Sequence, residues 1–161
     1  MNLRQVIVQV LAPSPVLTAR WRRQLYRAAG LRLSSAVRIE SRSLVKTQHF
    51  TVGSGTFINH GIFVDRGSLD IGQNVAVGPG VRFLTTTHEV AGPLCRAGAA
   101  LEAPIVVGDG VWIGACATIV GPSKVASGCV IAAGAVVVGD TAPNGLYAGV
   151  PARRIRELSA E

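Results

Sequence analysis

Aromatic residues, charged residues and cysteines are all scarce in this sequence. Of its 161 residues, 5% are aromatic and 16% are charged, whereas 48% are hydrophobic and 19 are glycine. So few aromatic side chains disfavour a globular core built on large rings, and the composition favours a solenoid with a thin aliphatic axis. A chain of this length makes one domain and can bury a real core.

The cysteines have no CxxC spacing and no metal-ligand spacing; the three are Cys95, Cys116 and Cys129. We therefore expect reduced thiols, no bound metal and a cytoplasmic protein. Long apolar runs are lacking as well, since the run at residues 6–11 is short and contains Gln9. It predicts neither a secretory signal nor a membrane-spanning helix.

Acidic residues are almost absent from the N-terminal quarter. Residues 1–46 contain nine Lys or Arg and one acid, Glu40, for a net charge of +8, whereas the remainder has seven bases and eight acids. Such a basic tract can meet phosphates or an anionic membrane, but no recognisable nucleic-acid-binding module accompanies it. We therefore expect no nucleic-acid partner.

A strict six-residue repeat runs from residue 107 to residue 142. An aliphatic side chain stands at every sixth position: Val107, Ile113, Ile119, Val125, Ile131 and Val137. Helices repeat near 3.6 residues and strands near 2, so a period of six predicts a short extended run, a bend and the same again, which is a β-solenoid. We expect one aliphatic rung per hexad to fill the axis. Small residues between the rungs are expected at the turns: Val111, Ala117, Ser123, Cys129, Ala135 and Thr141.

The repeat begins more loosely at Leu33 and is interrupted once. Nine earlier rungs predict three coils: Leu33, Ile39, Val45, Val52, Ile58, Val64, Ile71, Val77 and Phe83. After Phe83 the pattern stops, and residues 89–100, with Gly92, Pro93 and Gly98, are expected to leave the coil as a surface loop. A loop ejected from a rigid scaffold is a common place for function.

The two ends of the chain are expected to flank a β-helix at residues 33–142. Residues 1–32 predict a helical cap with two apolar faces, the second carrying Leu17, Trp21, Leu25 and Ala28. These helices would cover the open ladder of the solenoid. An alternative is a membrane-surface foot, with arginines of the second helix on lipid phosphates and Trp21 at the interface. Residues 143–161 form a C-terminal cap and tail, with a helical turn at 152–158.

The hexads and three local motifs resemble the hexapeptide-repeat acyltransferases, above all the maltose and galactoside O-acetyltransferases and glycan-modifying relatives. The motifs are Thr86-Thr87-His88, Val111-Trp112-Ile113-Gly114 and Ala148-Gly149-Val150-Pro151-Ala152-Arg153. The resemblance implies an all-β, left-handed parallel β-helix with three hexads per coil. It also implies a homotrimer with active sites between neighbouring prisms.

The same resemblance implies roles for individual residues. His88, immediately before the ejected loop, would be the general base, and histidine as a residue type exchanges protons near neutrality. Asn59 would contact the acceptor and the reacting centre, and Asp65 would contact the acceptor. The residues implied to bind coenzyme A are Trp112, Ala115, Ala133, Arg153 and Arg156.

We therefore predict an acetyl-CoA-dependent O-acetyltransferase whose acceptor is a sugar or polysaccharide precursor, with direct attack of a hydroxyl on the thioester. It would be cytoplasmic, or at the inner face of the membrane if residues 1–32 bind lipid. One alternative is an amino-sugar N-acetyltransferase with the same base. Two others are a non-catalytic β-helix scaffold and a carbonic-anhydrase-like zinc protein with His49, His60 and His88 as ligands.

Overall fold

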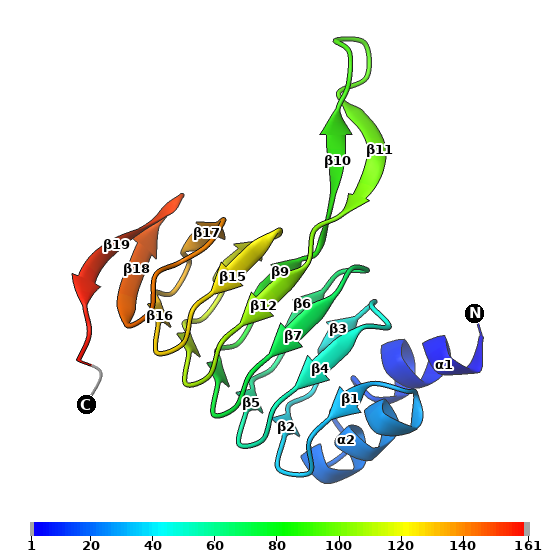
Figure 1. The fold of residues 1–161 in the computed structure, drawn as a ribbon. Coiled ribbons are helices and arrows are strands. Elements are labelled where there is room, and N and C mark those ends of the chain that lie inside the picture. The colour runs from blue at the N-terminus through cyan, green and yellow to red at the C-terminus, as the bar shows by residue number, and fades with distance from the viewer. Residues whose placement is uncertain (1, 160–161) are drawn as a thin grey trace.

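The computed structural model describes residues 2–159 as a three-sided prism with helices at one end and a projecting arm (Figure 1). The chain begins with α1 (Leu3–Val6), which continues as a π-helix, η1 (Ile7–Leu11), and after a turn forms α2 (Ala19–Ala28). Short strands then wind around the prism, one per side in each coil. The fold is the predicted all-β, left-handed parallel β-helix.

Each side of the prism is a sheet of strands from successive coils, paired in parallel. Sheet A, nearest the viewer in Figure 1, contains β1 (Arg32–Leu33), β4 (Phe50–Val52), β7 (Leu69–Ile71), β12 (Ile105–Val107) and β15 (Ser123–Val125). Sheet B contains β2 (Arg38–Ile39), β5 (Phe57–Ile58), β8 (Ala76–Val77), β13 (Trp112–Ile113), β16 (Val130–Ile131), β18 (Gly145–Gly149) and β19 (Ala152–Glu157). Sheet C contains β3 (Leu44–Val45), β6 (Phe63–Val64), β9 (Arg82–Leu84), β14 (Thr118–Val120) and β17 (Val136–Val138).

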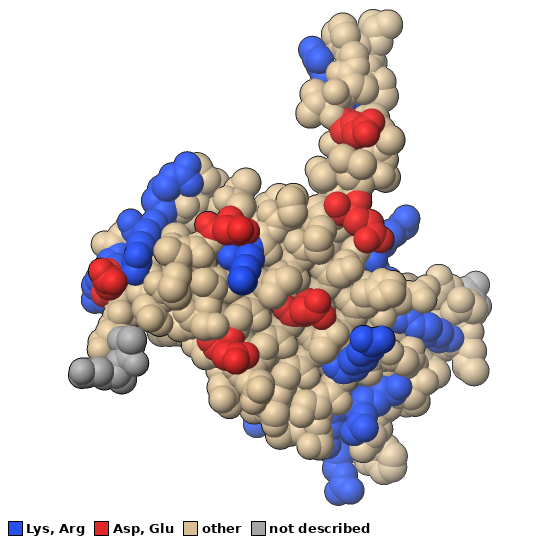
Figure 2. Space-filling view, in the orientation of Figure 1, with Lys and Arg blue, Asp and Glu red and all other residues tan. Residues whose placement is uncertain are grey.

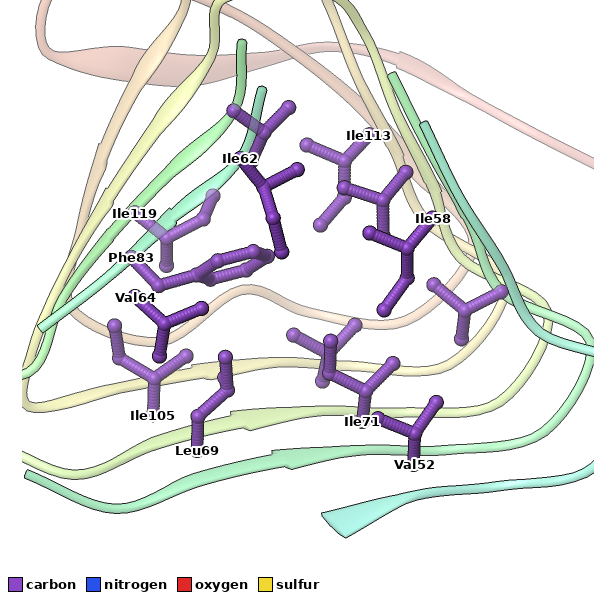
Figure 3. Packing of buried hydrophobic residues seen from close by; sticks show 14 of the residues in the cluster. Val52, Ile58, Ile62, Val64, Leu69, Ile71, Phe83, Ile105, Ile113 and Ile119 are labelled. Carbon is purple, nitrogen blue, oxygen red and sulfur yellow. The ribbon is translucent and has the colours of Figure 1, made fainter. Parts of the chain in front are cut away.

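All fifteen predicted rungs line the axis, and none is more than 6% exposed. Figure 3 shows rungs such as Val64 and Phe83 pointing into the triangle. The expectation of one axial residue per hexad was wrong, because the residue two places before each rung also points inward, as Ile62 and Leu69 do. Five of the six small residues predicted at the turns belong to this second set, Thr141 being the exception, and Ala117 and Cys129 are fully buried.

The segment predicted to leave the coil as a surface loop at 89–100 does leave it, and it forms most of a β-hairpin. Its strands are β10 (Thr86–Val90) and β11 (Ala97–Glu102), which pair antiparallel and form the arm in Figure 1. Away from the prism these residues have no other strand to pair with, so their backbone groups pair across the arm. The arm leaves the corner between sheets C and A, where both seven-residue steps of the repeat also fall.

The C-terminal segment is also a strand, so the predicted helical turn at 152–158 was wrong. The backbone of Gly149 has φ +98°, and the chain turns there so that β19 runs antiparallel to β18. A single helical turn is unfavourable in water, whereas pairing with β18 satisfies backbone groups at the open end of sheet B.

Helix α2 packs on the first coil through a different face from the predicted one. Trp21 is 65% exposed, whereas Arg22 and Tyr26 are buried. Burial raises the pKa of the Tyr26 phenol, and the nearby Arg22 cation opposes this rise. The membrane-foot alternative for residues 1–32 stays a prediction.

The buried arginine explains how the helix covers the open ladder. Each coil's carbonyls accept hydrogen bonds from the coil before it in the chain, as Thr56 and Ile58 accept from Arg38 and Glu40. The first coil has no earlier coil, so its strand carbonyls need other donors. Two arginines supply them: Arg22 donates to Ile39 O at 3.0 Å and Arg23 donates to Val37 O at 3.0 Å.

Charges are unevenly spread over the surface. In Figure 2 the Lys and Arg side chains gather over the N-terminal helices and first coil, and again over β18 and β19. No helix in residues 2–159 is both long and apolar enough to span a bilayer. Cys129 is buried, Cys95 and Cys116 are exposed, and none of the three forms a disulfide within the described part of the chain.

Replacing Gly114 by alanine is expected to destabilise the prism by about 1–3 kcal/mol through overpacking. A Cβ at this corner would lie 2.5 Å from the backbone N of Ala133 in the next coil. Equilibrium denaturation measures the change. The matched control is Gly92→Ala at the tip of the arm, where a Cβ meets no atom of the described residues within 4 Å. Equal stability of the two variants would contradict the close packing of the coils.

Candidate functional site

A groove of about 650 Å³ runs along the outer face of sheet B and its corner with sheet C. Its floor is a ladder of outward-facing side chains that lie in register on successive strands: Phe57, Ala76, Trp112, Val130 and Leu146. The floor is apolar and continuous over five coils. A surface of this kind suits a slender, largely apolar ligand that lies along the prism axis.

The corner wall of the groove is made of small residues and exposed backbone. Gly78 and Gly114 lie against the next coil, and a Cβ on Gly78 would approach Ala115 N to 2.7 Å. The backbone N–H groups of Ala115 and Ala133 lie on this wall, and neither donates a hydrogen bond to another residue in the range 2–159. They are therefore available to carbonyl groups of a ligand.

Polar groups stand at the two ends of the groove. At the N-terminal end, Asn59 Oδ1 accepts a hydrogen bond of 2.8 Å from the backbone N–H of His60, which leaves the amide NH₂ as the free donor. At the C-terminal end, the exposed Arg156 guanidinium makes no hydrogen bond or ion pair with the described residues. Below Asn59, Arg38 packs its guanidinium 5.3 Å from the Phe57 ring centre and pairs with Glu40 at 2.7 Å.

His88 lies on strand β10 of the arm and is held in one orientation. Its Nδ1 lies 2.9 Å from the carbonyl oxygen of Gly98 on the opposite strand. Because a carbonyl only accepts, Nδ1 carries the proton of the neutral ring and Nε2 keeps its lone pair. At the base of the arm, Thr86 Oγ1 donates a hydrogen bond to the Asp65 carboxylate. The imidazole therefore presents an acceptor nitrogen to solvent.

One chain brings together five of the eight predicted site residues. The groove is lined by Asn59, Trp112, Ala115, Ala133 and Arg156. Arg153 lies just beyond the lining, opposite Ala148 in the β18–β19 pair. His88 and Asp65 are not in the groove, because the arm leaves the prism at the corner opposite sheet B. Within one chain the His88 imidazole therefore lies away from the groove.

Four floor residues were missed from the sequence: Phe57, Ala76, Val130 and Leu146. Each immediately precedes a residue that is buried inside the prism, namely Ile58, Val77, Ile131 or Tyr147, so each faces outward. In a chain that is 48% hydrophobic, outward apolar residues do not stand out. Once the rungs are placed, the column of outward residues on each face follows from strand alternation.

The other two histidines lie at different corners of the prism. His49 is at the corner between sheets C and A, and His60 Nδ1 lies 3.0 Å from Ser41 Oγ at the corner between sheets B and C. Residues 2–159 contain no group of three or more His, Cys, Asp or Glu side chains that could hold a metal ion. A single chain therefore gives the zinc alternative no support.

The chain is similar to acetyltransferases in sequence and in structure. Residues 104–139 match the family described as bacterial transferase hexapeptide (six repeats). The galactoside O-acetyltransferase of Escherichia coli (strain K12) is 35% identical over 118 residues, which are 69% of this chain and 58% of that protein. The chain thus spans little more than half the length of this curated relative.

Two solved structures cover nearly the whole chain. A maltose O-acetyltransferase from Clostridium difficile 630 superposes with a TM-score of 0.75 at 24% identity, over 97% of this chain and 84% of that one. A hexapeptide-repeat acetyltransferase of Vibrio cholerae complexed with acetyl coenzyme A has a TM-score of 0.73 at 27% identity, over 98% and 84% of the two chains. Residues 104–139 therefore carry the hexapeptide repeat of this family, and the chain as a whole is similar to hexapeptide-repeat acetyltransferases.

Proposed function

We propose that this protein is an acetyltransferase that transfers the acetyl group of acetyl-CoA to a hydroxyl of a sugar or polysaccharide precursor. The observation that carries the proposal is the apolar groove on sheet B, with free backbone donors on its wall and a free guanidinium at its end. The names of the E. coli and C. difficile relatives and the acetyl coenzyme A bound by the V. cholerae relative support it.

The groove fits coenzyme A in its chemistry. The pantetheine arm is slender and mostly apolar, so it suits the floor around Trp112, and its two amide carbonyls can accept from Ala115 and Ala133 N–H. The nucleotide end carries several phosphate charges. Arg156 and the nearby Arg153 supply guanidinium groups, which bind phosphate oxygens in bidentate fashion.

The acyl transfer needs one base and one oxyanion donor. His88 Nε2 takes the proton of the acceptor hydroxyl while the hydroxyl oxygen bonds to the thioester carbonyl carbon. The carbon–sulfur bond then breaks, and the departing thiolate receives the proton from the imidazole. The Asn59 NH₂ group donates to the oxyanion that forms between the two steps. An amine acceptor would follow the same course, so amino sugars belong in the acceptor screen.

The complete site requires neighbouring copies, as in a homotrimer. The arm carries exposed apolar side chains, with Val90 85% exposed and Leu94 fully exposed. A two-stranded hairpin is marginally stable alone, so packing on a neighbouring prism would stabilise the arm. The same packing would bring His88 of one copy to the groove of the next.

Replacing Trp112 by alanine is expected to raise the KM for acetyl-CoA by about 10–100-fold, because the ring forms the centre of the apolar floor. Thiol release measured with a chromogenic disulfide reports turnover across sugars, amino sugars, nucleotide sugars and lipid-linked glycans. Val106→Ala is the matched control, since Val106 faces outward on sheet A and is 41% exposed. Failure of the wild type to release thiol with every acceptor, together with bound zinc, would overturn the acetyltransferase proposal.

A further inference from the structure

A second hollow, of about 630 Å³, lies on sheet C directly across one corner from the groove. Its strand residues include Phe63, Arg82 and Thr118, and its corner residues are Gly61, Gly80 and Cys116. The chain crosses from groove to hollow at the same corner in three successive coils, from Asn59 to Gly61, from Pro79 to Gly80 and from Ala115 to Cys116. A ligand in the hollow would therefore reach the reacting end of a donor that lies along the corner.

Arg82 is the principal charged group of this hollow. It lies in register between Phe63 and Thr118 on adjacent strands, with its side chain exposed. The guanidinium makes no hydrogen bond or ion pair with any residue that the structure describes. A second cation is close by, since Lys46 Nζ lies 5.0 Å from the centre of the Phe63 ring.

Within residues 2–159, no carboxylate forms an ion pair with Arg82 or Lys46. Asp65 follows β6 on the same face, but it accepts the hydrogen bond from Thr86 and forms no ion pair with Arg82 or Lys46 among the described residues. A neutral sugar would offer the guanidinium only hydroxyl groups. A phosphate or carboxylate would offer two oxygens for its paired N–H donors, in the geometry that arginine matches best.

We propose that the hollow on sheet C holds an anionic acceptor, a sugar that carries a phosphate or a carboxylate, and that Arg82 determines this specificity. The inference rests on the proposed acetyltransferase function and deepens it. Arg82 binds the acidic group, and the acceptor hydroxyl reaches the corner beside Asn59 where the thioester lies. The acceptor thus enters from sheet C, while coenzyme A occupies sheet B.

The test compares three matched acceptors: galactose, galactose 6-phosphate and galacturonate. We expect the wild type to prefer one of the two anionic sugars, and which of them it prefers separates phosphate from carboxylate recognition. Arg82→Gln should raise the KM for the preferred anionic sugar by about 10–100-fold relative to the KM for galactose, as loss of a charge-assisted hydrogen bond predicts. The KM for acetyl-CoA should stay at the wild-type value.

Arg32→Gln is the control, because Arg32 is an exposed arginine at the start of a strand on sheet A and forms no ion pair with the described residues. Equal KM values for the three sugars in the wild type, an equal effect of Arg82→Gln on all of them, or a rise in the KM for acetyl-CoA would each overturn the inference. Calorimetric binding of galactose 6-phosphate and galacturonate gives a readout without turnover. If no acceptor released thiol, the acetyltransferase proposal would fail, but binding lost in Arg82→Gln would still support the anion site, and unchanged binding would refute it.

Discussion

Replacing His88 by alanine is expected to lower kcat by about 10²–10⁴-fold, the range that a general base contributes. The hydrogen bond from Nδ1 to Gly98 O leaves Nε2 as the only acceptor on the ring, so no other atom of the side chain can take the hydroxyl proton. The dissociation constant of coenzyme A should not change, because the floor, the wall and the arginines proposed to bind it do not include His88. Thiol release measures kcat, and calorimetry measures the dissociation constant of coenzyme A.

Two controls separate a catalytic base from a structural histidine. His49→Ala removes an exposed histidine at the corner between sheets C and A and should keep wild-type kcat. Mixing His88→Ala with Asn59→Ala copies under exchange should restore activity at about a quarter of the sites, if copies assemble at random and each site takes His88 and Asn59 from different copies. Full activity of His88→Ala would refute the base, and no restoration in the mixture would refute the shared site.

The prism could be predicted because each side of every coil repeats the same six-residue pattern of side chains. Every sixth residue faces the axis, so Val107 and the rungs that follow it carry the same signal many times. The arm and β19 carry no such repetition. The two strands of the arm pair with each other, and β19 pairs with β18. Whether such an exposed segment forms a loop, a helix or a strand depends on which strand edges lie unpaired beside it.

The site could be predicted only in part for a related reason. Ala115 and Ala133 could be assigned to the coenzyme A site by resemblance, and both lie on the corner wall of the groove. His88 could be assigned a role by resemblance, but its distance from the groove could not be foreseen from spacing. Arg82 was not singled out at all, since one arginine in a strand looks like a solvated residue until its neighbours are known to leave it without a carboxylate.

Replacing Arg22 by methionine is expected to cost about 3–5 kcal/mol of stability, because it leaves several carbonyl groups without the hydrogen bonds that one guanidinium donates to them. Arg22 is 1% exposed and donates to Ala12 O and Ile39 O at 2.8 and 3.0 Å. Its Nη2 also donates to the carbonyl oxygens of Ser14 and Leu17 at 2.8 Å each. Methionine fills a similar volume but donates nothing, so the loss measures the hydrogen bonds more than the packing.

This single side chain joins the turn before α2, the helix itself and the unpaired edge of β2. Its removal should therefore loosen the cap before the rest of the prism, because each coil of a solenoid depends mainly on its neighbours. Denaturation monitored by fluorescence of Trp21 on α2 and Trp112 on β13 would report the two regions together, and a Trp112→Phe background isolates the cap. Arg20→Met on the exposed face of the same helix is the control and should melt like the wild type. If Arg22→Met is as stable as Arg20→Met, the guanidinium does not close the ladder, and the first coil must be protected in another way.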